Sequence, residues 1–317
     1  MRATFRMWRG AVATLRGTSV DFSPQRLGRH VDPTGLAGYY CDFRHKAEWA
    51  ERYGGMPRNM HGIPCEWVIP IAQAALGYWE LRLEGRQTER QFTRLADWLL
   101  ANARPRLGGV VWPIDLPVAK FELAPGWTSA MGQGQAASVL LRAHSLTGRA
   151  EYLDHAHAAL APLLVEVKDG GLMRVVDGHP VMEEYPSERP AAVLNGWTFS
   201  LFGVHELGRV AGNERARELF ERSAAGLVEL LPRYDTGWWS LYSLYDLGRP
   251  DLAKPFYQRL HPVLLSALSA LHPEPSLGYY AKRWQSQLTA AGMARASANK
   301  ILYRFSRERR QALAPQA

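Results

Sequence analysis

Cysteine is scarce in this sequence, and long apolar runs are missing. The 317 residues include two cysteines, Cys41 and Cys65, which are too few for a disulfide framework and are not spaced as metal ligands. No run of about eighteen uncharged apolar residues occurs, which excludes a membrane-spanning helix. The first twenty residues carry four arginines among short apolar pieces, without the continuous apolar segment of a signal peptide. We therefore expect no secretion signal and a cytoplasmic location.

Negative charge is also in deficit, since the formal net charge is +8. A basic balance favours an acidic partner such as nucleic acid, anionic lipid or anionic polysaccharide, although it also fits a merely solvated surface. No nucleic-acid-binding motif accompanies the charge, so we expect no nucleic-acid partner. His155 and His157 would point to different faces of a helix, and we expect no metal site.

Helical periodicity dominates from residue 66 onward, in a chain that is 47% apolar and therefore globular. The residues that share one face of the first helical segment are Trp67, Ile71, Ala74, Ala75 and Tyr78. Glycine recurs where an apolar helix gives way to an amphipathic one, as expected where a helix ends in a left-handed turn. These glycine-containing turns are expected at residues 83–86, 146–149, 210–213 and 246–249.

A second glycine marker follows each pair of helices, at residues 108–109, 170–171 and 237, and precedes a strand-like run such as 110–112. The two markers give a period of about sixty residues, one helical hairpin plus a short returning segment. Such hairpins must stack to bury their apolar faces.

The sequence therefore predicts a mainly α fold, an α/α toroid in the form of an incomplete α/α barrel, with short β segments in the connecting loops. It would contain three long hairpins, a shortened fourth, and helical segments near 277–291 and 297–312. We expect the toroid over residues 61–317 and an irregular N-terminal arm with short strands over residues 1–60.

Paired carboxylates and a phenol occur together in Glu183-Glu184-Tyr185-Pro186, shortly before Asn195-Gly196-Trp197. We expect this segment at the proline-stiffened start of an apolar helix, displaying its acid/base groups instead of burying them. Acidic residues also precede helices merely because they favour the positive end of the helix dipole. Because the loops that lead into the helices of a toroid line one mouth of its cavity, we expect Glu184 and Tyr185 to share a cleft with Trp127 and Tyr242.

Three blocks in the same order resemble the C-terminal catalytic region of the D-glucuronyl C5-epimerase family, whose members invert C5 of glucuronate in heparosan-type polysaccharides. The similarity extends over residues 60–290 and includes Val-Ile-Pro-Ile-Ala-Gln at 68–73. The blocks are Ala-Pro-Gly-Trp-Thr-Ser-Ala-Met-Gly-Gln-Gly-Gln-Ala at 124–136, the segment 183–196, and Leu-Pro-Arg-Tyr-Asp-Thr-Gly at 231–237 leading to Tyr242.

The resemblance implies that Glu184 and Tyr185 match a catalytic Glu-Tyr pair, and that Tyr242 and Tyr257 match two further catalytic tyrosines. His261 stands in place of a family histidine. The chain departs from the family at Tyr245, where an arginine that contacts the substrate carboxylate is expected. It also lacks the β-rich insertion of animal members, and with it any metal site located there.

Further residues near the matched blocks are candidates for substrate binding. Arg259 is a candidate to replace the missing arginine, and Trp127 to stack on a sugar face. Gln133, Gln135 and Asn195 are hydrogen-bonding candidates, and His261 completes the set. The plainer alternatives are that both glutamines bond to backbone, that Tyr185 and Tyr242 pack with satisfied hydroxyls, and that His261 is structural.

The predicted function is that of an isomerase without a cofactor, which converts D-glucuronate to L-iduronate in an anionic, heparan sulfate-like glycosaminoglycan of bacterial polysaccharide biosynthesis. Inversion at C5 requires proton-transferring groups on both faces of the ring. Tyrosine, with a reference pKa near 10, is a poor base unless cations such as Arg259, or those near Arg189, lower its pKa. The alternatives are a polysaccharide lyase, which removes the same proton and then expels the C4 substituent, and a non-catalytic glycan-binding scaffold. The resemblance is compatible with a homodimer.

Overall fold

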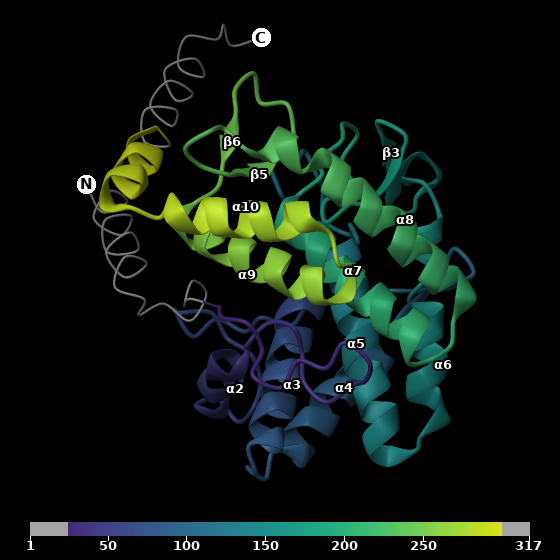
Figure 1. Cartoon of the computed structure of the whole chain (residues 1–317). Helices are drawn as coiled ribbons and strands as arrows, with labels where there is room; N and C mark the ends of the chain where they lie inside the picture. Colours follow the sequence, from purple (N-terminus) through teal and green to yellow (C-terminus); the bar gives the residue numbers. More distant parts are fainter. Residues whose placement is uncertain (1–24, 300–317) are drawn as a thin grey trace, which may run out of the picture.

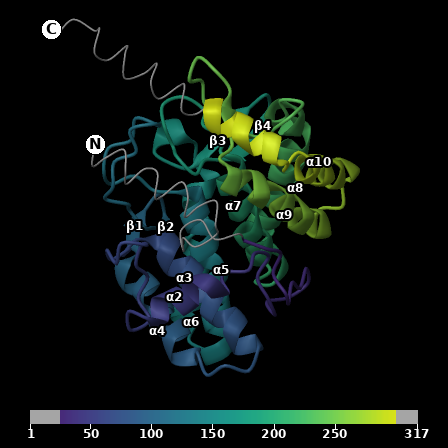
Figure 2. The same ribbon diagram turned by 90° about the vertical axis from the view of Figure 1, so that its left-hand side faces the viewer.

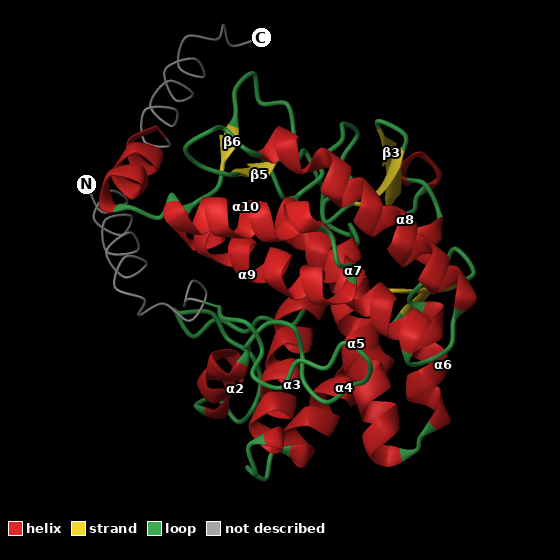
Figure 3. Ribbon diagram, in the orientation of Figure 1, coloured by secondary structure: helices red, strands yellow, loops and turns green. Residues whose placement is uncertain are grey.

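The structure is a computed structural model that describes residues 25–299. Helices make up most of it. In Figure 3 the strands are short pieces among long helices. The mainly α fold is therefore confirmed. The helices are α2 (Arg44–Glu51), α3 (Val68–Leu83), α4 (Glu89–Asn102), α5 (Ala130–Thr147), α6 (Ala150–Ala158), α7 (Leu194–Arg209), α8 (Glu214–Leu230), α9 (Pro255–Leu271) and α10 (Pro275–Ser286). Residues 290–299 are also helical.

The strands form three antiparallel pairs, each in a connection between helical hairpins. This agrees with the predicted β segments in connecting loops. The pairs are β1 (Arg104–Arg106) with β2 (Gly109–Val111), β3 (Met173–Val176) with β4 (His179–Met182), and β5 (Leu241–Ser243) with β6 (Asp251–Leu252).

Four helical hairpins, α3/α4, α5/α6, α7/α8 and α9/α10, stack through their first helices. The first helices form a row in which α3 packs on α5, α5 on α7, and α7 on α9, with α5 and α7 in the middle (Figures 1 and 2). Most residues of α5 and α7 are buried, whereas the second helices α4 and α8 bury one face. Within residues 25–299 no extensive contact between α3 and α9 closes the row, as expected of an incomplete barrel.

Three of the four predicted glycine turns separate the helices of a hairpin, and the fourth does not. Gly85, Gly148 and Gly212 have positive φ angles of 85°, 72° and 66°. Gly248 instead lies between β5 and β6, so its assignment to a helical hairpin was wrong. The real fourth turn, at residues 272–274, contains no glycine and is followed by Pro275 in the first turn of α10, where proline's fixed φ suits a helix start.

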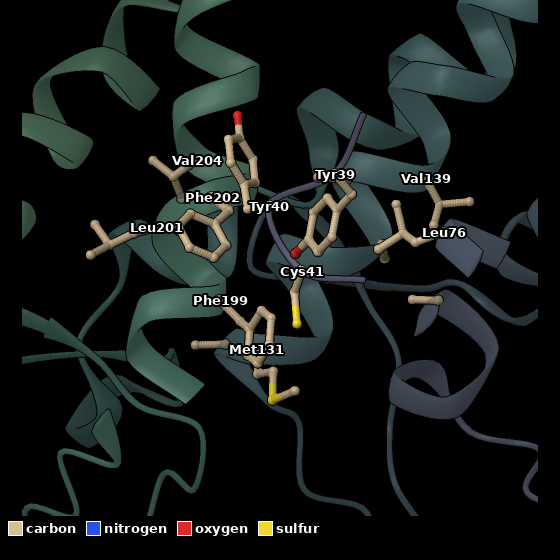
Figure 4. Packing of buried hydrophobic residues seen from close by; sticks show 14 of the residues in the cluster. Tyr39, Tyr40, Cys41, Leu76, Met131, Val139, Phe199, Leu201, Phe202 and Val204 are labelled. Carbon is tan, nitrogen blue, oxygen red and sulfur yellow. The ribbon is translucent and has the colours of Figure 1, made fainter. Parts of the chain in front are cut away.

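The N-terminal segment contributes to the same core as the hairpins. It contains the helix α2, which the sequence analysis did not predict. Tyr39 and Tyr40 are fully buried, and Tyr40 stacks on Phe202 of α7 at 4.4 Å between ring centroids (Figure 4). The predicted segment 297–312 falls almost entirely outside the described residues.

A buried ion pair fastens this segment to the row of inner helices. Arg142 of α5 donates to both carboxylate oxygens of Glu206 on α7, at 2.9 and 2.8 Å, and also to the carbonyl oxygen of Gly38. Both charged side chains are almost completely buried. Removing one partner would leave the other charge uncompensated in the core, which is strongly destabilising.

The backbones of α5 and α7 meet directly at two glycines. A Cβ added at Gly203 would lie 2.1 Å from the carbonyl oxygen of Gly134, and one added at Gly134 would lie 2.8 Å from the Cα of Ser200. These distances are far below van der Waals contact. Any side chain at either glycine would therefore separate the two central helices.

Gly203→Ala is expected to lower the free energy of unfolding by about 1–3 kcal/mol or more, because the added methyl group forces α5 and α7 apart. Urea denaturation measures the change. Gly278→Ala is the matched control, because an added Cβ in the middle of α10 meets nothing within 4 Å. There the loss of backbone freedom in the unfolded chain should raise stability by up to about 1 kcal/mol. Equal stability of the two variants would contradict the close packing.

Candidate active site

The segment 183–187 follows β4 and passes close to the first residues of α5 and α7. The N–H of Ala130 donates to the Glu183 carbonyl oxygen at 3.0 Å, which ties the segment to the start of α5. Glu183 and Glu184 are 0% and 5% exposed. The expectation of displayed carboxylates at a helix start was therefore wrong on two counts, because both are buried and α7 begins only at Leu194.

Glu183 holds the loop that leads into α7. Its carboxylate accepts hydrogen bonds from the N–H groups of Ala191 and Ala192, at 3.0 and 2.8 Å, and lies 3.3 Å from the Arg174 guanidinium. Burial raises the pKa of this carboxyl, while the two N–H donors and Arg174 oppose the rise. Ala192 has a φ of 42°, a left-handed conformation that is costly for alanine. Glu183 therefore has a structural role.

Glu184 lies against the first turn of α7. A Cβ added at Gly196 would come within 2.2 Å of Glu184 Oε2, so only glycine leaves room for the carboxyl here. Asn195 donates to the same oxygen over a long distance of 3.5 Å. Burial raises the pKa of Glu184 to about 7; the Tyr185 hydroxyl and Lys120 oppose this rise, and Glu183 adds to it. Near neutral pH, this carboxyl can both take and return a proton.

Three tyrosines form a chain of neighbouring side chains with Glu184. The Tyr185 hydroxyl acts on the pKa of Glu184, and the Tyr242 hydroxyl acts on the pKa of both Tyr185 and Tyr257. The rings of Tyr242 and Tyr257 are tilted, with centroids 4.6 Å apart. The four residues come from the loop before α7, from β5 and from the first turn of α9. The structure thus brings together all four candidate catalytic residues.

The phenols are neutral in the free protein. Burial is the largest cause that raises the pKa of Tyr185, Tyr242 and Tyr257 above the usual value, and the Glu184 carboxylate raises all three further. The condition under which a tyrosine alone would be a good base, a pKa lowered by nearby cations, is therefore not met. Glu184 is the group in the chain that ionises near neutral pH.

An aromatic wall surrounds Tyr185. Phe121 stacks on it at 4.3 Å between centroids, and Trp127 lies at 5.2 Å in a tilted arrangement. Tyr245 meets the ring of Phe121 edge-on at 5.1 Å. Trp127 is partly exposed, and its indole N–H donates to the carbonyl oxygen of Leu116, which fixes the ring. The predicted place of Trp127 beside the catalytic candidates therefore agrees with the structure.

The sequence analysis did not predict two residues at this site, Phe121 in the aromatic wall and Lys120 next to it. They precede the Pro-Gly-Trp block in the long loop between β2 and α5. Lys120 Nζ lies 4.4 Å from the centroid of the Tyr242 ring. The available signal was a lysine-phenylalanine pair close to a matched block, which is too common to stand out in a sequence.

Both glutamine candidates are buried in α5. Gln133 Nε2 donates to the carbonyl oxygens of Val110 and Ala159, at 2.8 and 3.0 Å, so it bonds to backbone. Gln135 is fully buried in α5 beside Tyr39.

Arg259 and His261 also differ from the expectation. The guanidinium of Arg259 contacts Met293 Sδ at 3.3 Å, and Lys120, not Arg259, is the cation beside Tyr242. His261 is fully buried, with Nδ1 2.8 Å from Ser240 Oγ, and burial lowers its pKa to about 3. This neutral imidazole is tilted against the ring of Tyr257, with ring centroids 6.5 Å apart.

Arg189 contacts Tyr245. Position 245 is the one where the resemblance implied an arginine. The Arg189 guanidinium donates to the Tyr245 hydroxyl at 2.8 Å and stacks over the ring at 4.5 Å. It also pairs with Glu122 at 3.0 Å. The charge of Arg189 is thus paired with Glu122 at the edge of the aromatic wall, and its N–H donors are used by Tyr245 and Glu122.

Between residues 25 and 299, histidine, cysteine, aspartate and glutamate side chains form no group of three or more suited to a metal ion. In the same range no helix has the length and apolar character needed to cross a membrane.

The chain is similar to known proteins over the region that contains the site. The sequence model described as "D-glucuronyl C5-epimerase C-terminus" matches residues 109–286. The D-glucuronyl C5-epimerase of Caenorhabditis elegans is 33% identical over 228 residues, which cover 65% of this chain and 37% of the relative. An uncharacterised protein of Methanocaldococcus jannaschii is 30% identical over 181 residues, which cover 56% of this chain and 57% of that protein. The chain thus spans less than two thirds of each of these relatives.

Glu184→Gln is expected to change the pH dependence of stability. The folded protein keeps Glu184 protonated up to about pH 7, whereas the unfolded chain releases this proton near 4.5. Between these values the unfolded state binds fewer protons, so the wild-type protein loses stability as pH rises, and the glutamine variant lacks this loss. From pH 5 to pH 8, the variant should gain roughly 2 kcal/mol relative to wild type in urea denaturation.

Glu188→Gln, a change of an exposed glutamate in the same loop, controls for the loss of a carboxyl group. It should show no comparable gain relative to wild type. A stability difference between wild type and Glu184→Gln that stays constant from pH 5 to pH 8 would contradict the raised pKa.

Proposed function

Because the chain belongs to the D-glucuronyl C5-epimerase family, we propose that it is an isomerase that inverts C5 of D-glucuronate in an anionic polysaccharide to give L-iduronate. The observation that carries the proposal is the cluster of the buried Glu184 carboxyl with Tyr185, Tyr242 and Tyr257, whose side chains act on one another's pKa values. It unites a carboxyl of pKa about 7 with phenols that can carry protons on either side of a sugar ring.

The first step removes the C5 proton, which is acidified by the neighbouring carboxylate. Tyr185 oxygen takes this proton while the Tyr185 hydroxyl proton passes to Glu184. The C5–H bond and the original Tyr185 O–H bond break, and a new Tyr185 O–H bond and a Glu184 O–H bond form, without a free phenolate. This coupling suits a tyrosine whose pKa is raised by burial. The electron pair of the C–H bond moves into the substrate carboxylate as an enediolate. A positioned base of this kind typically contributes about 10²–10⁴-fold to the rate.

The second step returns a proton to the opposite face of C5. Tyr242 or Tyr257 donates it, and the resulting phenolate regains a proton from Glu184 by way of the neighbouring phenols, which restores the site. Tyr185 and Tyr257 are partly exposed, so solvent hydrogen can enter the chain. Trp127 supplies an aromatic face for the sugar, and Asn195 orients the Glu184 carboxyl. The scheme needs no cofactor.

The direct test uses heparosan in deuterated buffer, with product analysis by NMR. The wild-type protein should introduce deuterium at C5 and form iduronate without cleaving the polymer. Glu184→Gln should lower kcat by about 10²–10⁴-fold, since it removes the proton acceptor. Tyr185→Phe should have a similar effect. Tyr279→Phe, a change of an exposed tyrosine on α10, is the control and should keep full activity.

The pH profile provides a second readout of the same experiment. Because Glu184 must be ionised to accept a proton, kcat/KM of the wild-type protein should rise with pH and level off above about 7. Appearance of unsaturated uronate ends would support a lyase. A folded wild-type protein that binds the polymer but exchanges no C5 hydrogen would support the scaffold alternative.

A further inference from the structure

One cation faces the phenols of the candidate site from a different part of the chain. Lys120 lies in the loop between β2 and α5, and its side chain is 33% exposed. Its Nζ is 4.4 Å from the ring centroid of Tyr242 and 4.7 Å from that of Phe121. Its positive charge also opposes the rise that burial causes in the pKa of Glu184, and the Glu184 carboxylate in turn opposes the fall that burial causes in the pKa of Lys120. The ammonium group therefore lies beside one phenol of the proposed proton transfer and acts electrostatically on its carboxyl group.

Lys120 is held in place by the strand pair that carries Tyr242. Its ammonium donates to Asp251 Oδ2, and the Ser243 hydroxyl donates to the same oxygen. Ser243 and Asp251 are partners in the β5–β6 register, and Asp251 is only 6% exposed. Position and charge of the lysine are thus fixed by a buried carboxylate beside Tyr242. An ammonium has three N–H donors, and one of them serves Asp251.

The proposed reaction requires such a cation. Removal of the C5 proton places a second negative charge on the uronate carboxyl group, and a fixed cation at that group stabilises the intermediate more than the ground state. Arg189 is engaged by Tyr245 and Glu122, and Arg259 faces Met293. Lys120 combines a position over the Tyr242 ring with partial exposure, which leaves its outer face open to a ligand.

We propose that Lys120 binds the carboxylate of the uronate unit and selects uronate over neutral hexose, an inference that rests on the proposed function. Tyr245, which stands where the resemblance implied an arginine, cannot supply a positive charge. Lys120 supplies it instead, from the loop between β2 and α5. Asp251 orients the ammonium group, and the substrate carboxylate accepts from its remaining donors. Lys120 would then both bind the substrate and stabilise the enediolate.

The test compares binding of two oligosaccharides by calorimetry, one with glucuronate units and its carboxyl-reduced form with glucose units. The wild-type protein should prefer the glucuronate form by on the order of tenfold or more, as expected of a charge-assisted hydrogen bond. Lys120→Met should abolish the preference, and Lys120→Arg should retain part of it. Lys168→Met removes an exposed lysine paired with Glu166 and should leave the preference intact.

Several outcomes would overturn the proposal. These are a wild-type protein that binds neither sugar or binds both equally, and a Lys120→Met variant that keeps the wild-type preference. If Lys120→Met does not fold, Lys120→Gln and Lys120→Arg carry the test, and an unchanged preference in both would refute it. The two claims can fail separately. If the wild-type protein exchanges no C5 hydrogen but the Lys120 variants lose the preference for glucuronate, the carboxylate site is upheld and the epimerase function is refuted. If the wild-type protein is active but the variants keep the preference, the epimerase function is upheld and the role of Lys120 is refuted.

Discussion

The direct backbone contact of α5 and α7 at Gly134 and Gly203 determines where the site can form. With these two helices in direct contact, their first turns both contact the segment that carries Glu184. Ala130 at the start of α5 bonds to the backbone of Glu183, and Gly196 in the first turn of α7 makes room for the Glu184 carboxyl. A side chain at any of the three glycines would disturb the packing or displace the carboxyl. The chemistry of the site therefore depends on the close approach of two helices.

Burial assigns different tasks to neighbouring groups. The Glu183 carboxylate accepts hydrogen bonds from two backbone N–H groups and holds the loop. The Glu184 carboxyl lies next to the Tyr185 hydroxyl and has a pKa of about 7. The same desolvation keeps the phenols neutral, which suits groups that pass protons without accumulating charge. Lys120, fixed by Asp251, places a positive charge beside this otherwise uncharged aromatic surface.

The sequence was sufficient for features with local signals and insufficient for those created by distant contacts. Glycines at residues 85, 148 and 212 indicated three hairpins because a left-handed turn favours glycine, whereas the fourth turn uses proline and was missed. The Glu-Tyr pair and the two later tyrosines were named from their motifs, and the structure brings them together. Lys120 lies 131 residues from Asp251, and no local pattern announces this pair. Likewise, nothing local shows that Gln133 and Gln135 face the interior.

The central claim is that the uronate ring lies between the phenols of the Glu184 chain, with a proton-transferring group on each face of C5. A crystal structure of the protein with a glucuronate-containing oligosaccharide tests it most directly. The account predicts C5 at about 3–3.5 Å from the Tyr185 hydroxyl oxygen, with the hydroxyl of Tyr242 or Tyr257 at a similar distance on the opposite face. A complex in which the uronate binds elsewhere, or in which all three hydroxyls lie on one face of the ring, would contradict it.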